Sequence, residues 1–297
     1  MSLVPENRAR GILWILATIV CFISLDATMK YTLQFLPLVE VTWARFFFSS
    51  VLSLIICGRD LPNLWRSNSP GSQLFRSLLL MLTTGFFNAG VMEVPLATAT
   101  VLMFMSPILV TVMSALVLQE HVGWRRWVGV AVGFLGATIV ARIWEDGLGM
   151  FNSGTLLLFI AAVCNASYQI STRKLRGDQP LTTLIYTAAT GTIVSTAILP
   201  WHWQMPDSKE WFLMVCAGVL GCVGHLCLIR AFRLAPASVI APFAYSSLIW
   251  AIVLGLVIWS DVPPLTTIIG AAMIIGSGLY IFFRERQLSA IQPGNLG

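Results

Sequence analysis

The sequence contains an uncharged apolar stretch of 25 residues, from Ala235 to Trp259, and this stretch limits what the chain can fold into. A helix of about 20 apolar residues crosses the ~30 Å hydrocarbon core of a bilayer, and buried helices of soluble proteins are rarely as long. Pro242 interrupts the stretch and is soon followed by polar side chains. In lipid such a break persists only where neighbouring helices or a water-lined cavity satisfy the freed backbone groups. The stretch therefore predicts a broken transmembrane helix beside a cavity.

A second stretch of this kind, 95–118, lies in the first half of the chain. It also starts with small residues, carries Ser106 and Pro107 near its middle, and ends before an acidic residue. Broken, uncharged spans at corresponding places in two halves of a chain are typical of transporters that bind their substrate between two repeats.

The composition extends this interpretation to the whole chain. Hydrophobic residues make up 57% and charged residues 10% of the sequence, whereas soluble domains have about 25% charged residues. The net charge of +5 is spread over short loops, which argues against a nucleic-acid partner. The six cysteines lie in or at the edge of apolar segments, so we expect no disulfide framework and no metal site. The expected spans are 11–31, 38–57, 75–92, 95–118, 126–143, 154–172, 181–201, 211–230, 235–259 and 264–283.

The positions of the basic residues predict the orientation. With a cytoplasmic N-terminus, 14 of the 18 Lys and Arg residues fall on the inner side. Lys30, Arg142 and Lys209 fall on the outer side, and Arg45 lies within a span. Because inner loops carry the excess of basic residues, we expect a multi-pass protein of the inner (plasma) membrane with both termini cytoplasmic.

The two halves of the sequence are related by a nearly constant offset, which predicts repeats at 11–142 and 154–284. Each half holds five expected spans, and because five is odd, the second half enters the membrane in the opposite direction. The expected fold is thus an all-α integral membrane protein, with ten transmembrane helices as two inverted five-helix repeats around a central cavity. Aligned pairs include Gly11 with Gly154, Cys21 with Cys164, Lys30 with Arg173, Pro37 with Pro180, Glu120 with Asp261 and Gly129 with Gly270.

These segments resemble the EamA family of the drug/metabolite transporter superfamily. The resemblance is carried by GILWILATIVCFISLDATMKY (11–31), VEVTWARFFFSS (39–50), the region 97–140, and AFRLAPASVIAPFAYSSLIWAIVLGLVIWSD (231–261). It implies ten helices around a cavity that the first, third and fourth helices of each half chiefly line. Family members move amino acids, nucleotide-derived metabolites, vitamins and drugs. Asp26 and Lys30, with Glu40 and Arg45, are most similar to the branches that include S-adenosylmethionine and riboflavin carriers.

Charged residues inside spans are costly, so each is a candidate for an ion pair or for coupling. Asp26 and Lys30 are four residues apart on one helix face. They either form a local ion pair near the interface, or Asp26 faces the cavity and binds a cation or a proton. Arg45 either pairs with Asp26 or Glu40 to hold its helix in the bundle, or contacts a carboxylate of the substrate.

Polar residues on the expected lining helices and beside the breaks are candidates for substrate binding. His225 suits a proton relay because histidine titrates near physiological pH. Helix–helix hydrogen bonding and packing are the alternative roles for the whole set. The candidates are Asn88, Ser106, Asn165, Tyr168, Gln169, His225, Tyr245, Ser246 and Trp250.

Small residues on the fifth and tenth spans predict that these two helices pack closely together. The expected contact faces are Gly129, Gly133 and Gly136 on one helix and Ala272 and Gly276 on the other.

The function expected from the sequence is secondary transport by alternating access of a small polar or amphipathic metabolite, of the amino acid-like, S-adenosylmethionine or riboflavin class. An exporter of amino acids or drugs is the alternative within the same fold. A membrane-embedded enzyme or a structural protein is less consistent with two broken spans, and no clustered catalytic residues are present. We expect no cofactor. The expected partners are the substrate, the lipid bilayer and a proton or solute counter-ion, for a monomer or weak homodimer.

Overall fold

The computed structural model describes residues 7–58, 64–117, 119, 123–142, 153–175 and 178–291. Regular structure in these residues is entirely helical. The helices of the first half are α1 (Arg8–Thr32), α2 (Leu38–Cys57), α4 (Pro70–Val91), α5 (Leu96–Met103), α6 (Met105–Val117) and α7 (Trp124–Ala141). Those of the second half are α8 (Ser153–Lys174), α9 (Pro180–Ile198), η2 (Leu199–Trp201), α10 (Ser208–Leu234), α11 (Ala237–Ile240), η3 (Ala241–Ser246), α12 (Ser247–Trp259) and α13 (Leu265–Ile291).

Nine helical segments within the described residues are long and apolar enough to cross a membrane. They correspond to nine of the ten expected spans. The remaining expected span, 126–143, overlaps α7, whose 18 residues carry Arg125 and Arg126 near their start and are therefore less apolar over their whole length. Glu120, the expected repeat partner of Asp261, lies outside the described residues.

Both proline-containing stretches are broken, but in different ways. Proline cannot donate to the carbonyl four residues before it, and its ring crowds that carbonyl. For Pro107 this carbonyl belongs to Met103, where α5 ends, so the break lies at Phe104 and Pro107 itself is inside α6. Around Pro242 the chain instead forms η3, a 3-10 helix of six residues between α11 and α12.

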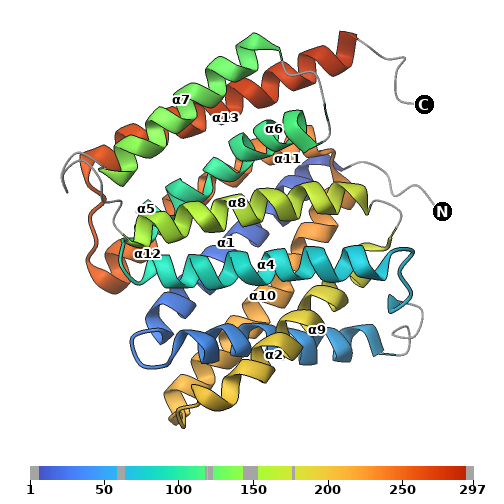
Figure 1. Cartoon of the computed structure of the whole chain (residues 1–297), viewed down its shortest axis with the longest axis vertical. Coiled ribbons are helices and arrows are strands. Elements are labelled where there is room, and N and C mark those ends of the chain that lie inside the picture. The colour runs from blue at the N-terminus through green and yellow to red at the C-terminus, as the bar shows by residue number, and fades with distance from the viewer. Residues whose placement is uncertain are drawn as a thin grey trace.

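Helices from the two halves pack against one another throughout the molecule (Figure 1). The most extensive contacts join α1 with α10, α4 with α8, and α7 with α13, followed by α2 with α10 and with α9. The pair of α7 and α13 forms one edge of the molecule and the pair of α2 and α9 the opposite edge, with the other helices between them. The N-terminal end of α1 and the C-terminal end of α13 lie on the same side.

The close packing of α7 on α13 is present, but one of its two expected faces is wrong. A Cβ on Gly136 would lie 2.9 Å from the carbonyl oxygen of Gly270, and one on Gly133 would lie 2.9 Å from Oγ of Ser277. Ala272 and Gly276 are exposed instead. The small residues that face α7 occupy the opposite side of α13, so the stripe predicted from spacing alone had the wrong rotation about the helix axis.

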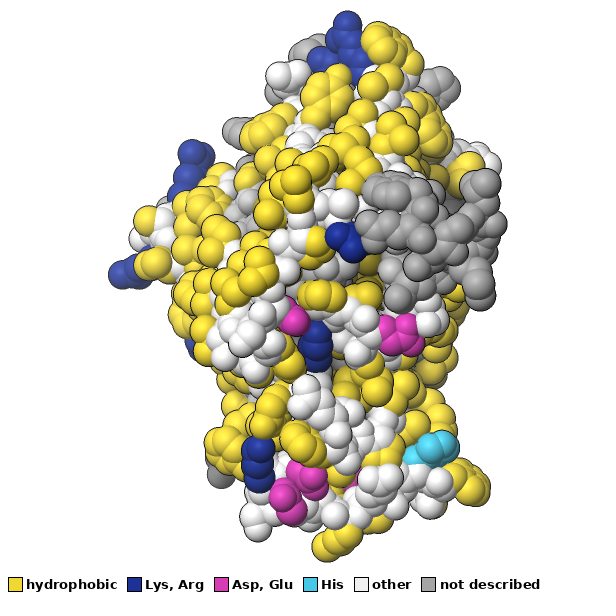
Figure 2. All heavy atoms as spheres, turned by 90° about the vertical axis from the view of Figure 1, so that its left-hand side faces the viewer, with side chains coloured by type: hydrophobic (Ala, Val, Ile, Leu, Met, Phe, Trp, Pro, Cys, Tyr) yellow, Lys and Arg dark blue, Asp and Glu magenta, His cyan; other side chains and the backbone are white. Residues whose placement is uncertain are grey.

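The surface of the molecule carries large hydrophobic side chains. Figure 2 shows them around scattered basic and acidic groups on the face where α1 ends. Soluble monomers rarely expose large contiguous apolar areas, whereas a lipid-facing surface must. The most exposed of these side chains include Ile55, Leu116, Ile193, Met205, Phe212 and Val257.

Candidate functional site

A cavity of about 410 Å³ lies in the middle of the bundle, between the two halves of the chain. Its wall is contributed by α1, α2, α4, α5, α8, α10, η3 and α12, together with Phe104 at the break after α5. The polar lining consists of Thr18, Asp26, Arg45, Thr83, Thr84, Thr100, Asn165, Tyr168, His225 and Ser247, and the aromatic lining also includes Phe22, Phe87 and Phe104.

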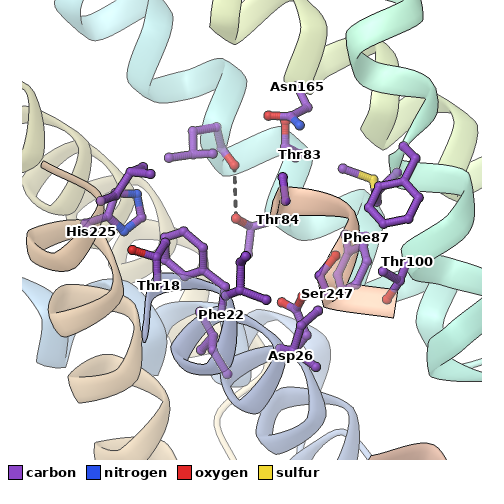
Figure 3. Close-up of a pocket in the computed structure, with 18 of the residues that line it drawn as sticks. Thr18, Phe22, Asp26, Thr83, Thr84, Phe87, Thr100, Asn165, His225 and Ser247 are labelled. Atoms are coloured by element: carbon purple, nitrogen blue, oxygen red, sulfur yellow. Dashed lines mark hydrogen bonds between the residues drawn. The ribbon is translucent and has the colours of Figure 1, made fainter. Parts of the chain in front are cut away.

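Helical periodicity explains why these residues share one wall. Thr18, Phe22 and Asp26 are four residues apart along α1 and so lie on one face. On α4, Leu80, Thr84 and Phe87 follow the same helical spacing. In Figure 3, Asp26 of α1 and Asn165 of α8 lie on opposite sides of the cavity, with Thr84 of α4 between them.

Asp26 and Arg45 bring opposite charges to this cavity. Nη1 of Arg45 donates a hydrogen bond of 2.8 Å to Oγ1 of Thr84. Thr84 in turn donates to the carbonyl of Leu80, and this second hydrogen bond is the one drawn in Figure 3. Asp26 receives no hydrogen bond from the described residues, and none of their basic groups forms an ion pair with it. Neither of the pairings expected for Arg45, with Asp26 or with Glu40, is therefore seen as a direct contact.

His225 and Asn165 present further polar groups to the cavity. Nδ1 of His225 lies 2.9 Å from the carbonyl oxygen of Gly221, so in the neutral ring Nδ1 donates and Nε2 is left as an acceptor. The ring packs edge-on against Phe22. Asn165 donates through Nδ2 to Oγ of Ser106, which is itself buried and bonds to the carbonyl of Ala162.

The other candidates are not part of the cavity lining. Asn88 is buried against α2 and donates to Thr42. Tyr245 packs edge-on against Phe104 and has its hydroxyl beside Gly278. Trp250 is 41% exposed on the surface of α12. Gln169 and Ser246 are also absent from the lining of this cavity.

Several lining residues were not expected from the sequence. Thr18, Thr83, Thr84 and Thr100 lie on apolar helices where threonine commonly bonds to the backbone of its own helix, and all four do so here. The sequence offered one signal for them: Thr18 lies on the same face of its helix as Asp26, and the other three lie on helices that were expected to line the cavity. Phe22, Phe87 and Ser247 had no distinguishing signal in an apolar sequence.

Lys30 lies at the end of the bundle where α1 ends, and it contacts both halves of the chain there. Its Nζ donates a 2.8 Å hydrogen bond to the carbonyl of Val94, in the turn between α4 and α5. It also lies 3.8 Å from Oδ2 of Asp261 and 5.0 Å from the ring centre of Trp259, both in the second half. Its ionic partner is therefore Asp261, and not Asp26 one turn earlier on the same helix.

Arg76 occupies the opposite end, buried between α4, α8 and α9. Its guanidinium donates to Oγ1 of Thr172 and to the hydroxyl of Tyr168, both at 2.8 Å, and lies over the Tyr168 ring. Longer hydrogen bonds reach Gln73, Thr187 and the carbonyl of Thr183. Because Tyr168 also lines the cavity, this network fixes part of the cavity wall.

Asp178 extends the Arg76 network outside the helices. Its carboxylate accepts hydrogen bonds from Gln73, from Ser67 and from the backbone of Asn68. Burial alone would raise the pKa of this carboxyl, but these three hydrogen bonds outweigh it and hold the pKa below the usual aspartate value. Asp178 thereby joins the segment before α4 to the segment before α9.

The described residues contain no group of three His, Cys, Asp or Glu side chains that could hold a metal ion. What the cavity offers instead is one carboxylate, one guanidinium, hydroxyl and amide groups, and aromatic surface. This combination suits the binding of a small organic solute.

Comparisons with known proteins match transporters over nearly the whole chain. The model of the EamA-like transporter family matches residues 9–142 and again residues 152–283. An S-adenosylmethionine uptake transporter of Rickettsia prowazekii (strain Madrid E) is 30% identical over 95% of each chain. A riboflavin transporter of Vibrio cholerae is also 30% identical, over 94% of each chain. A crystal structure with 18% identity superposes with a TM-score of 0.65, covering 95% of this chain and 99% of the other, which shows a shared fold.

Proposed function

The chain belongs to the EamA-like transporter family of the drug/metabolite transporter superfamily, and we propose that it is a secondary transporter that works by alternating access. The proposed substrate is a metabolite of the S-adenosylmethionine or riboflavin class, and the proposed site is the central cavity. The observation that carries the proposal is this cavity, which lies between two segments that each match the same family model.

The packing of the helices supports ten spans in two inverted repeats, at 11–142 and 154–284. If α8 corresponds to α1 and α10 to α4, the contact of α1 with α10 is equivalent to that of α8 with α4. The contacts of α2 with α9 and of α7 with α13 then join equivalent helices of the two halves. This correspondence requires α7 to be a span like its counterpart α13. Rocking of such halves about a site between them is the usual basis of alternating access.

The proposed location is the inner (plasma) membrane, with both termini in the cytoplasm. The excess of basic residues on one side supports this orientation. A reporter that is active only in the periplasm, fused to the C-terminus, should be inactive, and the same reporter in the loop before α10 should be active. The reverse pattern would overturn the orientation.

The size and lining of the cavity support a metabolite as substrate. Its volume lies within the range of roughly 300–1,000 Å³ that is common for small-molecule sites. The aromatic side chains of Phe22, Phe104 and Tyr168 can contact a planar ring. S-adenosylmethionine and riboflavin, which the relatives are named for, both contain a planar ring system. The sequence has no nucleotide-binding motif, so accumulation would depend on a proton or solute gradient, with Asp26 as the proposed coupling group.

Counterflow in proteoliposomes tests the function directly. Vesicles loaded with unlabelled S-adenosylmethionine should take up the labelled compound, with saturation, and riboflavin should be tested in the same way. Replacing Asn165 by Leu should lower exchange because Asn165 lines the cavity, whereas Leu135→Ala, on the exposed surface of α7, should not. If neither compound shows saturable exchange, the proposed substrate class is contradicted.

A further inference from the structure

Two opposite charges face the cavity without forming a salt bridge with each other. The carboxylate of Asp26 comes from α1 and the guanidinium of Arg45 from α2. The one ion pair among the described side chains joins Lys30 to Asp261, so Asp26 and Arg45 are not directly paired. Each therefore keeps unused hydrogen-bonding capacity that can be directed to a molecule in the cavity.

The contacts of Arg45 leave most of its donors free for such a molecule. One nitrogen donates to Thr84, and the guanidinium lies 5.5 Å from the ring centre of Phe46. Arginine has five N–H donors in a planar fork that matches the two oxygens of a carboxylate. Thr84 thus holds the side chain in place and leaves the rest of the fork available.

The electrostatics of the cavity favour a ligand that carries both charges. A charge taken out of water is costly unless it is paired and hydrogen-bonded. A neutral solute would leave both Asp26 and Arg45 unpaired and would displace the water that solvates them. A simple cation or anion would satisfy one of them and leave the other unpaired. A zwitterion with its two charges in the complementary order satisfies both.

We propose that the cavity binds the zwitterionic head group of an α-amino acid, with the ammonium at Asp26 and the carboxylate at Arg45. This inference rests on the proposed transport function and narrows its substrate class to solutes that carry such a head group. S-adenosylmethionine has this group, and riboflavin does not. The remainder of the solute lies against the aromatic surface of Phe22, Phe104 and Tyr168, where Nε2 of His225 accepts a hydrogen bond from an amine or hydroxyl.

The test uses ligands that each lack one charged group. Labelled S-adenosylmethionine exchange is competed by three compounds: unlabelled S-adenosylmethionine, its decarboxylated form, and its 2-oxo analogue, in which a keto group replaces the amine. With the wild-type protein, each analogue should bind roughly 10- to 100-fold more weakly, because each loses a charge-assisted hydrogen bond. Equal competition by all three compounds would overturn the inference and leave the transport function standing.

Matched substitutions assign each group to its partner. Arg45→Gln should weaken S-adenosylmethionine to the level of the decarboxylated form, whose own affinity should stay within about 3-fold of its wild-type value. Asp26→Asn should weaken S-adenosylmethionine to the level of the 2-oxo analogue, whose own affinity should likewise stay close to its wild-type value. Leu135→Ala is the control, since this side chain lies on the exposed face of α7. Equal weakening of all three ligands by either cavity substitution would show a structural role in place of head-group binding, and would overturn the inference.

Two further experiments, with a second variant and a second ligand series, address the remaining outcomes. If Arg45→Gln does not fold, Arg45→Lys retains the charge and should keep a preference, though a smaller one, for the ligand with its carboxylate. If S-adenosylmethionine is not exchanged, the same series is made from L-methionine, its amine and its 2-oxo acid. Exchange and discrimination in that series would uphold the head-group assignment while rejecting S-adenosylmethionine as substrate. Exchange of riboflavin alone would reject the head-group assignment, and no exchange of any of these compounds would reject the proposed substrate class with it.

Discussion

Lys30 and Arg76 are cations at opposite ends of the helix bundle, and their surroundings differ in kind. Lys30 has a carboxylate partner, Asp261, which is one-third exposed, and a single hydrogen bond to a backbone carbonyl. Arg76 is 2% exposed and is bonded only to neutral oxygens, with no carboxylate in contact among the side chains that the structure describes. The first cation joins two loops, and the second joins three helices.

This difference indicates that the two ends are not equally easy to open. Hydrogen bonds to a charged group contribute more than those between neutral groups, and Arg76 makes several at once. A partly exposed ion pair contributes little, and water can replace it. The Lys30 end is therefore the one whose contacts can be exchanged at low cost, and the Arg76 end is the fixed one. The predictions below test this difference.

The largest effect is expected for Arg76→Leu. The change leaves the buried oxygens of Thr172, Thr187 and Tyr168 without their donor, which should cost about 3 kcal/mol or more. The apparent melting temperature in detergent should fall by roughly 6–12 °C. Arg66→Leu, at an exposed arginine before α4, is the control and should change stability by less than about 0.5 kcal/mol. A small effect at Arg76 would mean that the network does not hold this end together.

Lys30→Met should mainly change accessibility, with little loss of stability. Loss of one ion pair and one hydrogen bond, about 1–2 kcal/mol, would shift an open–closed equilibrium roughly 5- to 30-fold. The measurement is labelling of Thr100→Cys, in the cavity wall, by a membrane-impermeant thiol reagent in cells, with the six native cysteines replaced. Lys209→Met is the control, because Lys209 is exposed and contacts Tyr31 at the same end. Unchanged labelling would show that Lys30 does not close the cavity.

A smaller effect is expected for Asp261→Asn, which removes the charge but keeps an acceptor. Labelling should rise about 2- to 5-fold, as for the loss of a surface ion pair. In the Lys30→Met background the change should add nothing, because its partner is already gone. Raising the salt concentration to about 1 M should reduce the difference in labelling between the wild-type protein and the Asp261→Asn variant, since the pair is partly exposed. Additive effects of the two substitutions would show that the residues act separately.

The smallest effect concerns pH and the Asp178 contacts at the Arg76 end. The pKa of Asp178 lies below the ordinary value of about 3.9 in an unfolded chain. The ionised group therefore stabilises the folded state above about pH 4, and this contribution is lost as pH falls through the folded pKa. Melting temperatures of wild type and Asp178→Asn should differ most near pH 6 and converge below about pH 3. Parallel curves would exclude a role for the Asp178 charge.

The sequence predicted the helical architecture well because the signal for a span is long and apolar. The two broken spans were found from Pro107 and Pro242, although the first break lies at Phe104, where the proline ring acts on the preceding turn. Rotation of a helix about its axis was harder to predict. In a uniformly apolar helix nothing distinguishes the lipid-facing side, so Ala272 was assigned to the wrong face and the role of Trp250 was left open.

Prediction of the candidate site was limited by partners that lie far apart in the sequence. Asp26 and Arg45 were identified because a charge in a span is rare, but their shared position in the cavity wall depends on the packing of α1, α2 and α4. Lys30 was assigned to Asp26 or to the interface because Asp261 is more than 200 residues away. Arg76 was counted only as a basic residue near one side of the membrane, and its network with α8 and α9 could not be inferred from α4 alone.

The six-residue 3-10 helix η3 has a consequence for the shape of the cavity. A 3-10 helix rises about 2.0 Å and turns about 120° per residue, whereas an α-helix rises 1.5 Å and turns 100°. Rewinding Ala241–Ser246 into α-helical form would shorten the segment by about 3 Å and turn α12 by about 120° relative to α11. Ala244 and Ser247 line the cavity, so the same rewinding would replace part of its wall with other residues of the same helix. The helical form of this segment of the second half thus determines which residues of η3 and α12 a bound solute contacts.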